Sequence, residues 1–183
     1  MRYLLFAISA LAAFVYTSAV SAFPEGPPPG HTGGKLSGNQ QPDCSVCHFA
    51  GPDPSAQSGL TLQGWPDQVE PDAVYELKLQ LLDPEAKVGG FQLLIVNSEG
   101  ASGIFNALAK QQVVSDEQFE YLGHTEPTHT AEDEETGEMK VVWQIQWRAP
   151  HEPGVFAIFA AAVGADDDDS PLGDTAYTLS IAP

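Results

Sequence analysis

Hydrophobic and polar residues alternate along several short stretches of this chain. The apolar positions of residues 140–149 are Val141, Trp143, Ile145 and Trp147, and polar side chains fill most of the positions between them. The same period of two recurs at Tyr75, Leu77, Leu79 and Leu81. A period of two predicts β-strands with one buried face.

Turn residues separate eight such stretches. The predicted strands are residues 59–64, 73–82, 90–97, 103–108, 119–123, 140–149, 154–163 and 175–181. Only residues 117–121 have a pattern compatible with a helix. Eight short strands at this spacing predict an all-β fold, an immunoglobulin-like antiparallel β-sandwich forming a single domain.

The first part of the chain has a different character. Residues 1–22 form a short, mostly apolar stretch with Arg2 near its start and small residues at its end, which predicts a signal peptide cleaved before Phe23. A membrane anchor is the alternative, but the apolar core is short for a bilayer span. Residues 23–58 are rich in Pro and Gly and should be irregular, forming one structural unit with the sandwich of residues 59–183. We therefore expect an exported protein, periplasmic or secreted, without membrane insertion after signal cleavage.

Acidic residues dominate the charge of the chain. Seven Lys and Arg stand against 25 Asp and Glu, for a formal net charge of −18. Such a surface excludes nucleic-acid binding and favours cationic partners, although it can also serve solubility alone. Two acidic runs, residues 132–135 and 166–169, fall between predicted strands. Calcium is a candidate ligand there, but neither run has EF-hand spacing, so solvated loops are favoured.

The only two cysteines lie in the stretch CSVCH, as Cys44 and Cys47, with His48 next. In c-type haem attachment two such thiols bond to the haem vinyl groups, and the adjacent histidine becomes the proximal iron ligand. Zinc held by both cysteines and two histidines is an alternative. A thioredoxin-like redox disulfide needs a βαβ context that is missing here, and a structural disulfide is compatible with export. One covalent haem c per chain is the favoured interpretation.

A second axial ligand has several candidates. They are His31, His124, His129, His151 and Met139. His124 is favoured because it ends a short apolar run that could place it in a buried site, whereas Met139 adjoins a charged loop. His31 and His129 are the next alternatives, and His151 is expected at the surface. A bis-histidine iron has no open position, which favours electron transfer over a peroxidase or oxygenase activity.

The order of several motifs resembles the bacterial choice-of-anchor V domain, which is related to the reelin amino-terminal (reeler) domain. These motifs are HTGG, CSVCH, GLTLQGWPDQVEPDAVYEL, GGFQLLIVNSEGASGIF, YLGHT, WQIQWRAP and GVFAIFAAAVGA with GDTAY, and they span nearly all of residues 23–183. The resemblance implies an immunoglobulin-like sandwich with Cys-x-x-Cys-His and a histidine at the position of His124. Such domains often precede an anchoring tail; none is evident in residues 177–183, so a periplasmic or released form is expected.

These observations predict an exported monohaem cytochrome that passes single electrons and is not an enzyme. Cys44 and Cys47 would attach the haem, with His48 and His124 as ligands. Trp65 and Phe49 are predicted to shield the haem face, and the acidic surface to select a redox partner with a basic docking surface. The alternative is a haem-free extracellular binding or adhesion module, with the cysteines in a zinc site or a disulfide.

Overall fold

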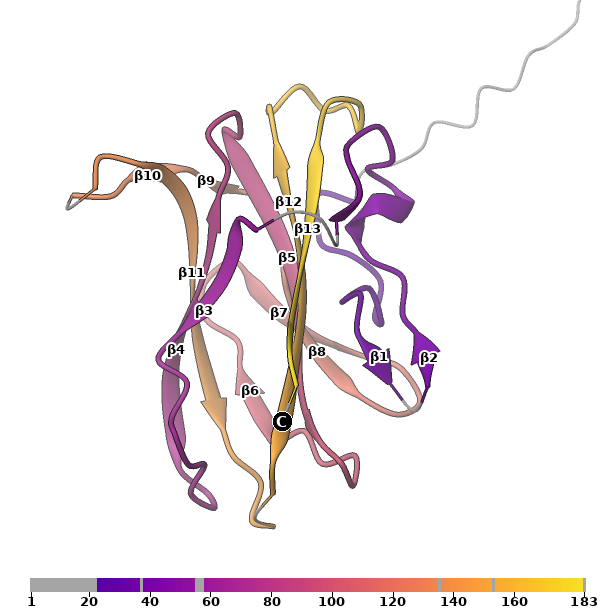
Figure 1. The fold of residues 1–183 in the computed structure, drawn as a ribbon, viewed down its shortest axis with the longest axis vertical. Helices are drawn as coiled ribbons and strands as arrows, with labels where there is room; N and C mark the ends of the chain where they lie inside the picture. The colour runs from indigo at the N-terminus through magenta and orange to yellow at the C-terminus, as the bar shows by residue number, and fades with distance from the viewer. Residues whose placement is uncertain (1–22, 37, 55–57, 135, 153, 183) are drawn as a thin grey trace, which may run out of the picture.

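Two antiparallel β-sheets pack face to face, and an irregular N-terminal segment lies along the outside of one of them (Figure 1). The computed structural model describes residues 23–36, 38–54, 58–134, 136–152 and 154–182. The predicted signal peptide lies outside these residues. No helix within the described part of the chain is long and apolar enough to cross a membrane.

The first sheet has five strands. Its strands in order are β10 (Ala131–Glu132), β11 (Met139–Arg148), β4 (Val74–Leu82) and β3 (Leu60–Gln63), and β6 (Ile104–Asn106) also pairs with β11. The long β4–β11 pairing sets Leu79 opposite Trp143 and Leu77 opposite Ile145. The alternating apolar residues of both strands therefore point to the same side.

The second sheet has six strands. They are β13 (Thr175–Ile181), β12 (Phe156–Ala165), β5 (Val88–Asn97), β8 (Glu120–His124) and β7 (Gln111–Ser115), with β9 (Thr128–His129) also pairing with β5. The N-terminal segment carries a small hairpin of β1 (Lys35–Leu36) and β2 (Asn39–Gln40), followed by the 3-10 helix η1 (Cys44–Val46). The all-β sandwich predicted from the sequence is confirmed.

The main core lies between the two sheets. Val141, Trp143, Ile145 and Trp147 are all buried there, as the period of two predicts. They meet the inward side chains of β5 and β12, including Phe91, Leu93 and Ile158. Burial of this apolar surface is the main contribution to the stability of the sandwich.

Three details differ from the sequence predictions. Residues 117–121 form no helix: the Asp116 carboxylate accepts hydrogen bonds from the backbone N–H groups of Gln118 and Phe119, both at 2.8 Å, and closes a turn. Strand β8 begins directly afterwards, at Glu120. Strand β7 was not predicted, because its sequence QQVVS has only a short apolar pattern. Both acidic runs were predicted to be loops. In the first run Glu132 belongs to strand β10, whereas the second run, residues 166–169, forms a loop as expected.

Strand β5 is buried on both faces, although an outer strand face of a sandwich is commonly solvated. Its outer face meets a second apolar cluster formed with the N-terminal segment and neighbouring strands. The buried members are Leu94, Val96, Tyr121 and Phe159, with Leu36 packed against them. The N-terminal segment approaches so closely that a Cβ added at Gly34 would lie 2.9 Å from the Cβ of Phe159.

Polar contacts also hold the N-terminal segment to this sheet. The Thr32 hydroxyl donates to Gln41 at 2.6 Å, the Gln41 amide donates to the Tyr121 hydroxyl at 2.8 Å, and that hydroxyl donates to Asp116 at 2.8 Å. Nearby, the buried Gln92 side chain accepts from the His31 backbone N–H at 2.6 Å. These hydrogen bonds pair the polar groups named here where the segment meets the sheet.

Candidate functional site

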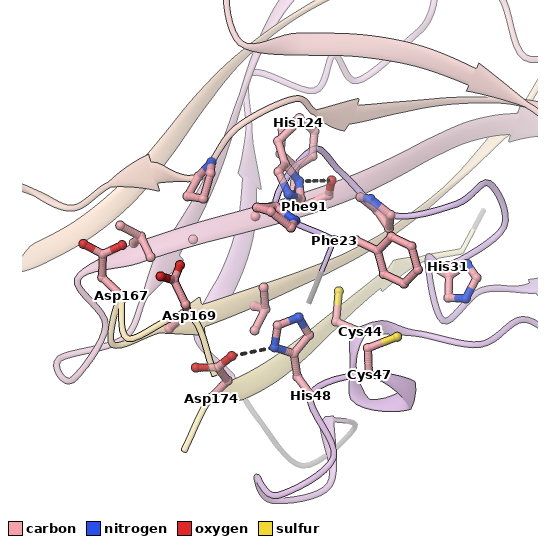
Figure 2. A pocket seen from close by; sticks show the side chains of 18 of the residues that line it. Phe23, His31, Cys44, Cys47, His48, Phe91, His124, Asp167, Asp169 and Asp174 are labelled. Carbon is pink, nitrogen blue, oxygen red and sulfur yellow. Dashed lines mark hydrogen bonds and ion pairs between the residues drawn. The ribbon is translucent and has the colours of Figure 1, made fainter. Parts of the chain in front are cut away.

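A cavity lies between the N-terminal segment and one end of the six-stranded sheet (Figure 2). About 870 Å³ of free space lies among its lining residues, a figure that includes open solvent at the mouth. Much of the wall is apolar: Phe23, Pro24, Pro27, Pro28, Val88, Phe91, Pro127, Val163 and Ala165. Both cysteines and three of the five histidines also line it.

The two cysteines reach the cavity through a tight turn. The Asp43 carboxylate caps η1 by accepting from the Ser45 N–H at 2.8 Å, and the His48 N–H donates to the Cys44 carbonyl at 3.0 Å. This turn brings Cys44, Cys47 and His48 to the same wall (Figure 2). Both cysteines are free thiols. Burial, followed by the charges of Asp43 and Cys47, raises the pKa of the Cys44 thiol to about 12.

His48 is held by a carboxylate from the far end of the sequence. Its Nδ1 lies 2.5 Å from Oδ2 of Asp174, which directly precedes β13. An ionised carboxylate can only accept, so Nδ1 donates, and in the neutral imidazole Nε2 then keeps its lone pair. In Figure 2 the Asp174 contact is on one side of the His48 ring, and the rest of the ring is turned toward His124. Burial raises the pKa of the Asp174 carboxyl, and the hydrogen bond from His48 partly offsets that effect.

His124 faces the cavity from the end of β8. Its Nδ1 lies 3.1 Å from the carbonyl oxygen of Phe91 and 2.9 Å from the Phe91 N–H nitrogen. When Nδ1 donates to that carbonyl, Nε2 is left with a lone pair, as iron ligation requires. Burial lowers the pKa of His124; the Phe91 backbone opposes this, and the charge of His48 adds to it. The electrostatic effect of His48 agrees with the two rings sharing one cavity.

A glycine makes room for the His124 ring. A Cβ built on Gly90 would lie 2.7 Å from Nε2 and 2.9 Å from Nδ1 of His124. Real Cβ atoms are not found at such separations. Gly90 and His124 are both buried residues of the six-stranded sheet, so neither can easily move aside. Gly90 is therefore part of the site although it has no side chain.

The other candidate ligands differ in position. His31 lines the cavity, with its ring Nδ1 3.0 Å from the Pro28 carbonyl oxygen. His129 is an exposed residue of β9, and Met139 is 41% exposed at the start of β11, beside a different, shallow hollow. His151 is exposed, and its Nδ1 lies 2.7 Å from Oδ2 of Asp72. Of these four residues, only His31 lines the cavity.

The prediction that Trp65 and Phe49 shield the haem face is wrong. Trp65 is partly buried and packs against the main core, with its ring centroid 5.4 Å from that of Trp147, and Phe49 is 56% exposed. The aromatic rings that line the cavity are Phe23 and Phe91. Sequence proximity to the cysteines was a poor guide, because the neighbours of Trp65 are core residues from distant strands.

Two residues of the site, Asp174 and Gly90, were not predicted from the sequence. The pattern GDTAY shows only that Asp174 precedes a strand, and no feature connects it with His48, 126 residues earlier. Gly90 follows Gly89 at the start of β5. Glycines within a strand indicate that another part of the protein approaches closely, but the sequence does not show which part. The pairing of β5 with β8 decides the contact of Gly90, and the packing of the N-terminal segment on the sheet decides that of Asp174.

An acidic loop forms one edge of the cavity. Asp167, Asp168 and Asp169 follow β12 and line the mouth, where all three are exposed. Within the part of the chain that the structure describes, no three or more His, Cys, Asp or Glu side chains are grouped to hold a metal ion. A four-ligand zinc site is thus not preformed among the described residues, whereas haem iron takes only two axial ligands from the protein.

Comparisons with known proteins concern the fold. No family model matches the chain, and no curated protein matches it. Among solved structures, the Reelin-N domain of F-spondin is similar with a TM-score of 0.45 and 16% identity, over 75% of this chain and 95% of that one. Two fragments of the human F-spondin reeler domain have TM-scores of 0.43 and 0.39, with 17% and 19% identity, over 73% and 68% of this chain and 96% and 90% of theirs. The choice-of-anchor resemblance rests on the sequence motifs alone.

Proposed function

We propose that this chain is an exported monohaem c-type cytochrome that carries single electrons. Cys44 and Cys47 hold the haem through thioethers, His48 is the proximal ligand and His124 the distal one. One observation carries the proposal: two free thiols and two imidazoles, each engaged at Nδ1, line a single largely apolar cavity.

The residues present suit a porphyrin. The prolines of the N-terminal segment, together with Phe23 and Phe91, offer apolar surface to a flat hydrophobic ring. His48 and His124 both use Nδ1 for their hydrogen bonds, so Nε2 is the nitrogen that each would offer to iron, His124 in the tautomer that donates from Nδ1 to the Phe91 carbonyl. His31 also borders the cavity and is the second choice for the distal position.

Attachment needs no oxidant. Each cysteine S–H adds across one vinyl group: a C–S bond forms on one carbon, and the hydrogen passes to the other. Burial raises the pKa of the Cys44 thiol to about 12 in the folded, haem-free chain, so little thiolate is present there near neutral pH.

A bound haem would supply one-electron redox chemistry. His48 and His124 would both ligate its iron, which would leave no iron position for oxygen or substrate. This arrangement supports an electron carrier rather than a peroxidase or oxygenase. The formal charge of −18 and the acidic cavity mouth support a redox partner with a basic docking surface.

The test is expression of the full chain, leader included, in cells competent for cytochrome c maturation. We expect a purified protein with the visible spectrum of a low-spin c-type haem and an intact mass increased by one haem. Cys44→Ala with Cys47→Ala should lose the covalent mass. A colourless wild-type protein from such cells would contradict the proposal, and zinc or a disulfide would then account for the cysteines.

The axial assignment has its own matched pair of variants. His124→Ala should convert the oxidised spectrum from low-spin to high-spin. His129→Ala, which alters an exposed histidine outside the cavity, should leave the spectrum unchanged. An unchanged spectrum in His124→Ala would instead place the distal ligand elsewhere, with His31→Ala as the next variant to examine.

A further inference from the structure

We propose that Asp174 is a positioning residue that orients His48 toward the cavity and strengthens it as an iron ligand, thereby lowering the reduction potential. This inference rests on the haem function proposed above. Among the candidate iron ligands, the Asp174 carboxylate contacts only His48.

The contact between the two side chains is short and buried. His48 Nδ1 and Asp174 Oδ2 are 2.5 Å apart, and the Asp174 residue is 1% exposed. Hydrogen bonds to a charged acceptor are shorter and stronger than neutral ones. A histidine that donates one N–H to a carboxylate has a fixed ring orientation and a more basic second nitrogen.

The surroundings leave the carboxylate dependent on His48. Its second oxygen, Oδ1, is buried without a hydrogen-bond partner among the described residues. Besides His48 itself, the neighbouring charges that act on it are those of Asp166 and Asp168, which are also negative. Among these neighbours His48 is therefore the one favourable partner of the Asp174 carboxylate, and the negative potential of Asp174 falls on the His48 N–H.

Rigid backbone holds the carboxylate in place. Asp174 directly precedes β13, whose first residue Thr175 pairs with Gly164 of β12. On the other side, a Cβ added at Gly51 would lie 2.5 Å from the Asp174 carbonyl oxygen, so the N-terminal segment packs directly on this backbone. Groups fixed by the sheet on one side and by packing on the other keep their geometry when a ligand binds.

A more basic imidazole donates more electron density to iron and favours its oxidised state. Removing the charge of Asp174 should therefore raise the reduction potential. Asp174→Asn tests this with little change of shape, because asparagine can still accept the His48 N–H through its neutral carbonyl. Asp168→Asn is the matched control, since it removes a nearby negative charge that does not touch His48.

The experiment is a spectroelectrochemical titration of the haem-loaded full chain and its variants. We expect the midpoint potential of Asp174→Asn to rise clearly more than that of Asp168→Asn, and Asp174→Glu to return toward the wild-type value. Equal shifts in the two Asn variants would overturn the inference, because Asp174 would then act only as one of several charges.

A second measurement needs no haem. In the colourless chain, the ¹⁵N shifts of the His48 ring should show a protonated Nδ1 in the wild type and change in Asp174→Ala. Unchanged His48 shifts would overturn the positioning role. If the wild type loads no haem, the proposed function fails, and these shifts still decide whether Asp174 orients His48.

Discussion

The ring of His124 lies directly against Gly90, so that even a methyl group on this glycine would be only 2.7 Å from Nε2. Gly90→Ala should therefore displace the imidazole from its place against the Phe91 backbone. In a haem-loaded protein we expect partial or full loss of the low-spin spectrum, which visible absorption would record.

Gly123→Ala is the matched control for this substitution. Gly123 precedes His124 in β8 and is also buried, but its added Cβ would lie 3.4 Å from the nearest atom, the Phe91 carbonyl oxygen. The spectrum of Gly123→Ala should resemble that of the wild type. Equal losses in both variants would mean that general sheet damage, rather than ring displacement, causes the effect.

The hydroxyl of Tyr121 links the N-terminal segment to the sheet. Tyr121→Phe should destabilise the fold by about 1–3 kcal/mol, because Gln41 loses its acceptor and Asp116 loses a donor in a partly buried site. Urea unfolding followed by tryptophan fluorescence would measure the loss. Tyr75→Phe is the control: its hydroxyl accepts a hydrogen bond from Glu70 at an exposed position, so a smaller change is expected.

Tyr121 also predicts a response to alkaline pH. Burial and the hydrogen bond to Asp116 raise the pKa of its phenol to about 12, above the ordinary value of 10.0. The folded state thus keeps a proton that the unfolded state releases, so stability falls as pH rises from about 10 through 12. Unfolding free energies measured across this range should fall less steeply in Tyr121→Phe than in the wild type. Identical slopes would show that Tyr121 titrates normally in the fold.

The Cys44 thiol should be unreactive in the folded, haem-free chain. Its pKa of about 12, against an ordinary 9.0, corresponds to about a thousand-fold less thiolate near neutral pH. Alkylation with iodoacetamide, followed by peptide mass mapping, should label Cys44 slowly in buffer and rapidly in urea. Similar rates in both conditions would show that the thiol is already accessible in the folded chain.

Local sequence was informative wherever one strand or one turn decides the outcome. The period of two placed Val141, Trp143, Ile145 and Trp147 on the buried side, because alternate side chains of a strand must point to opposite faces. It was misleading at residues 117–121, where the hydrogen bonds of Asp116 close a turn that an apolar pattern does not reveal. It was also misleading for Trp65, whose neighbours come from distant strands.

One part of the candidate site is likewise determined by local sequence, and the rest by the tertiary structure. The close spacing of Cys44, Cys47 and His48 is a property of the sequence, since a short turn keeps these side chains together in any fold that contains it. Only the tertiary structure brings His124 to the same cavity, fits its ring over Gly90 and sets Asp174 against His48. These contacts depend on strand pairing and on the packing of the N-terminal segment, and both join residues too far apart in sequence for local patterns to specify.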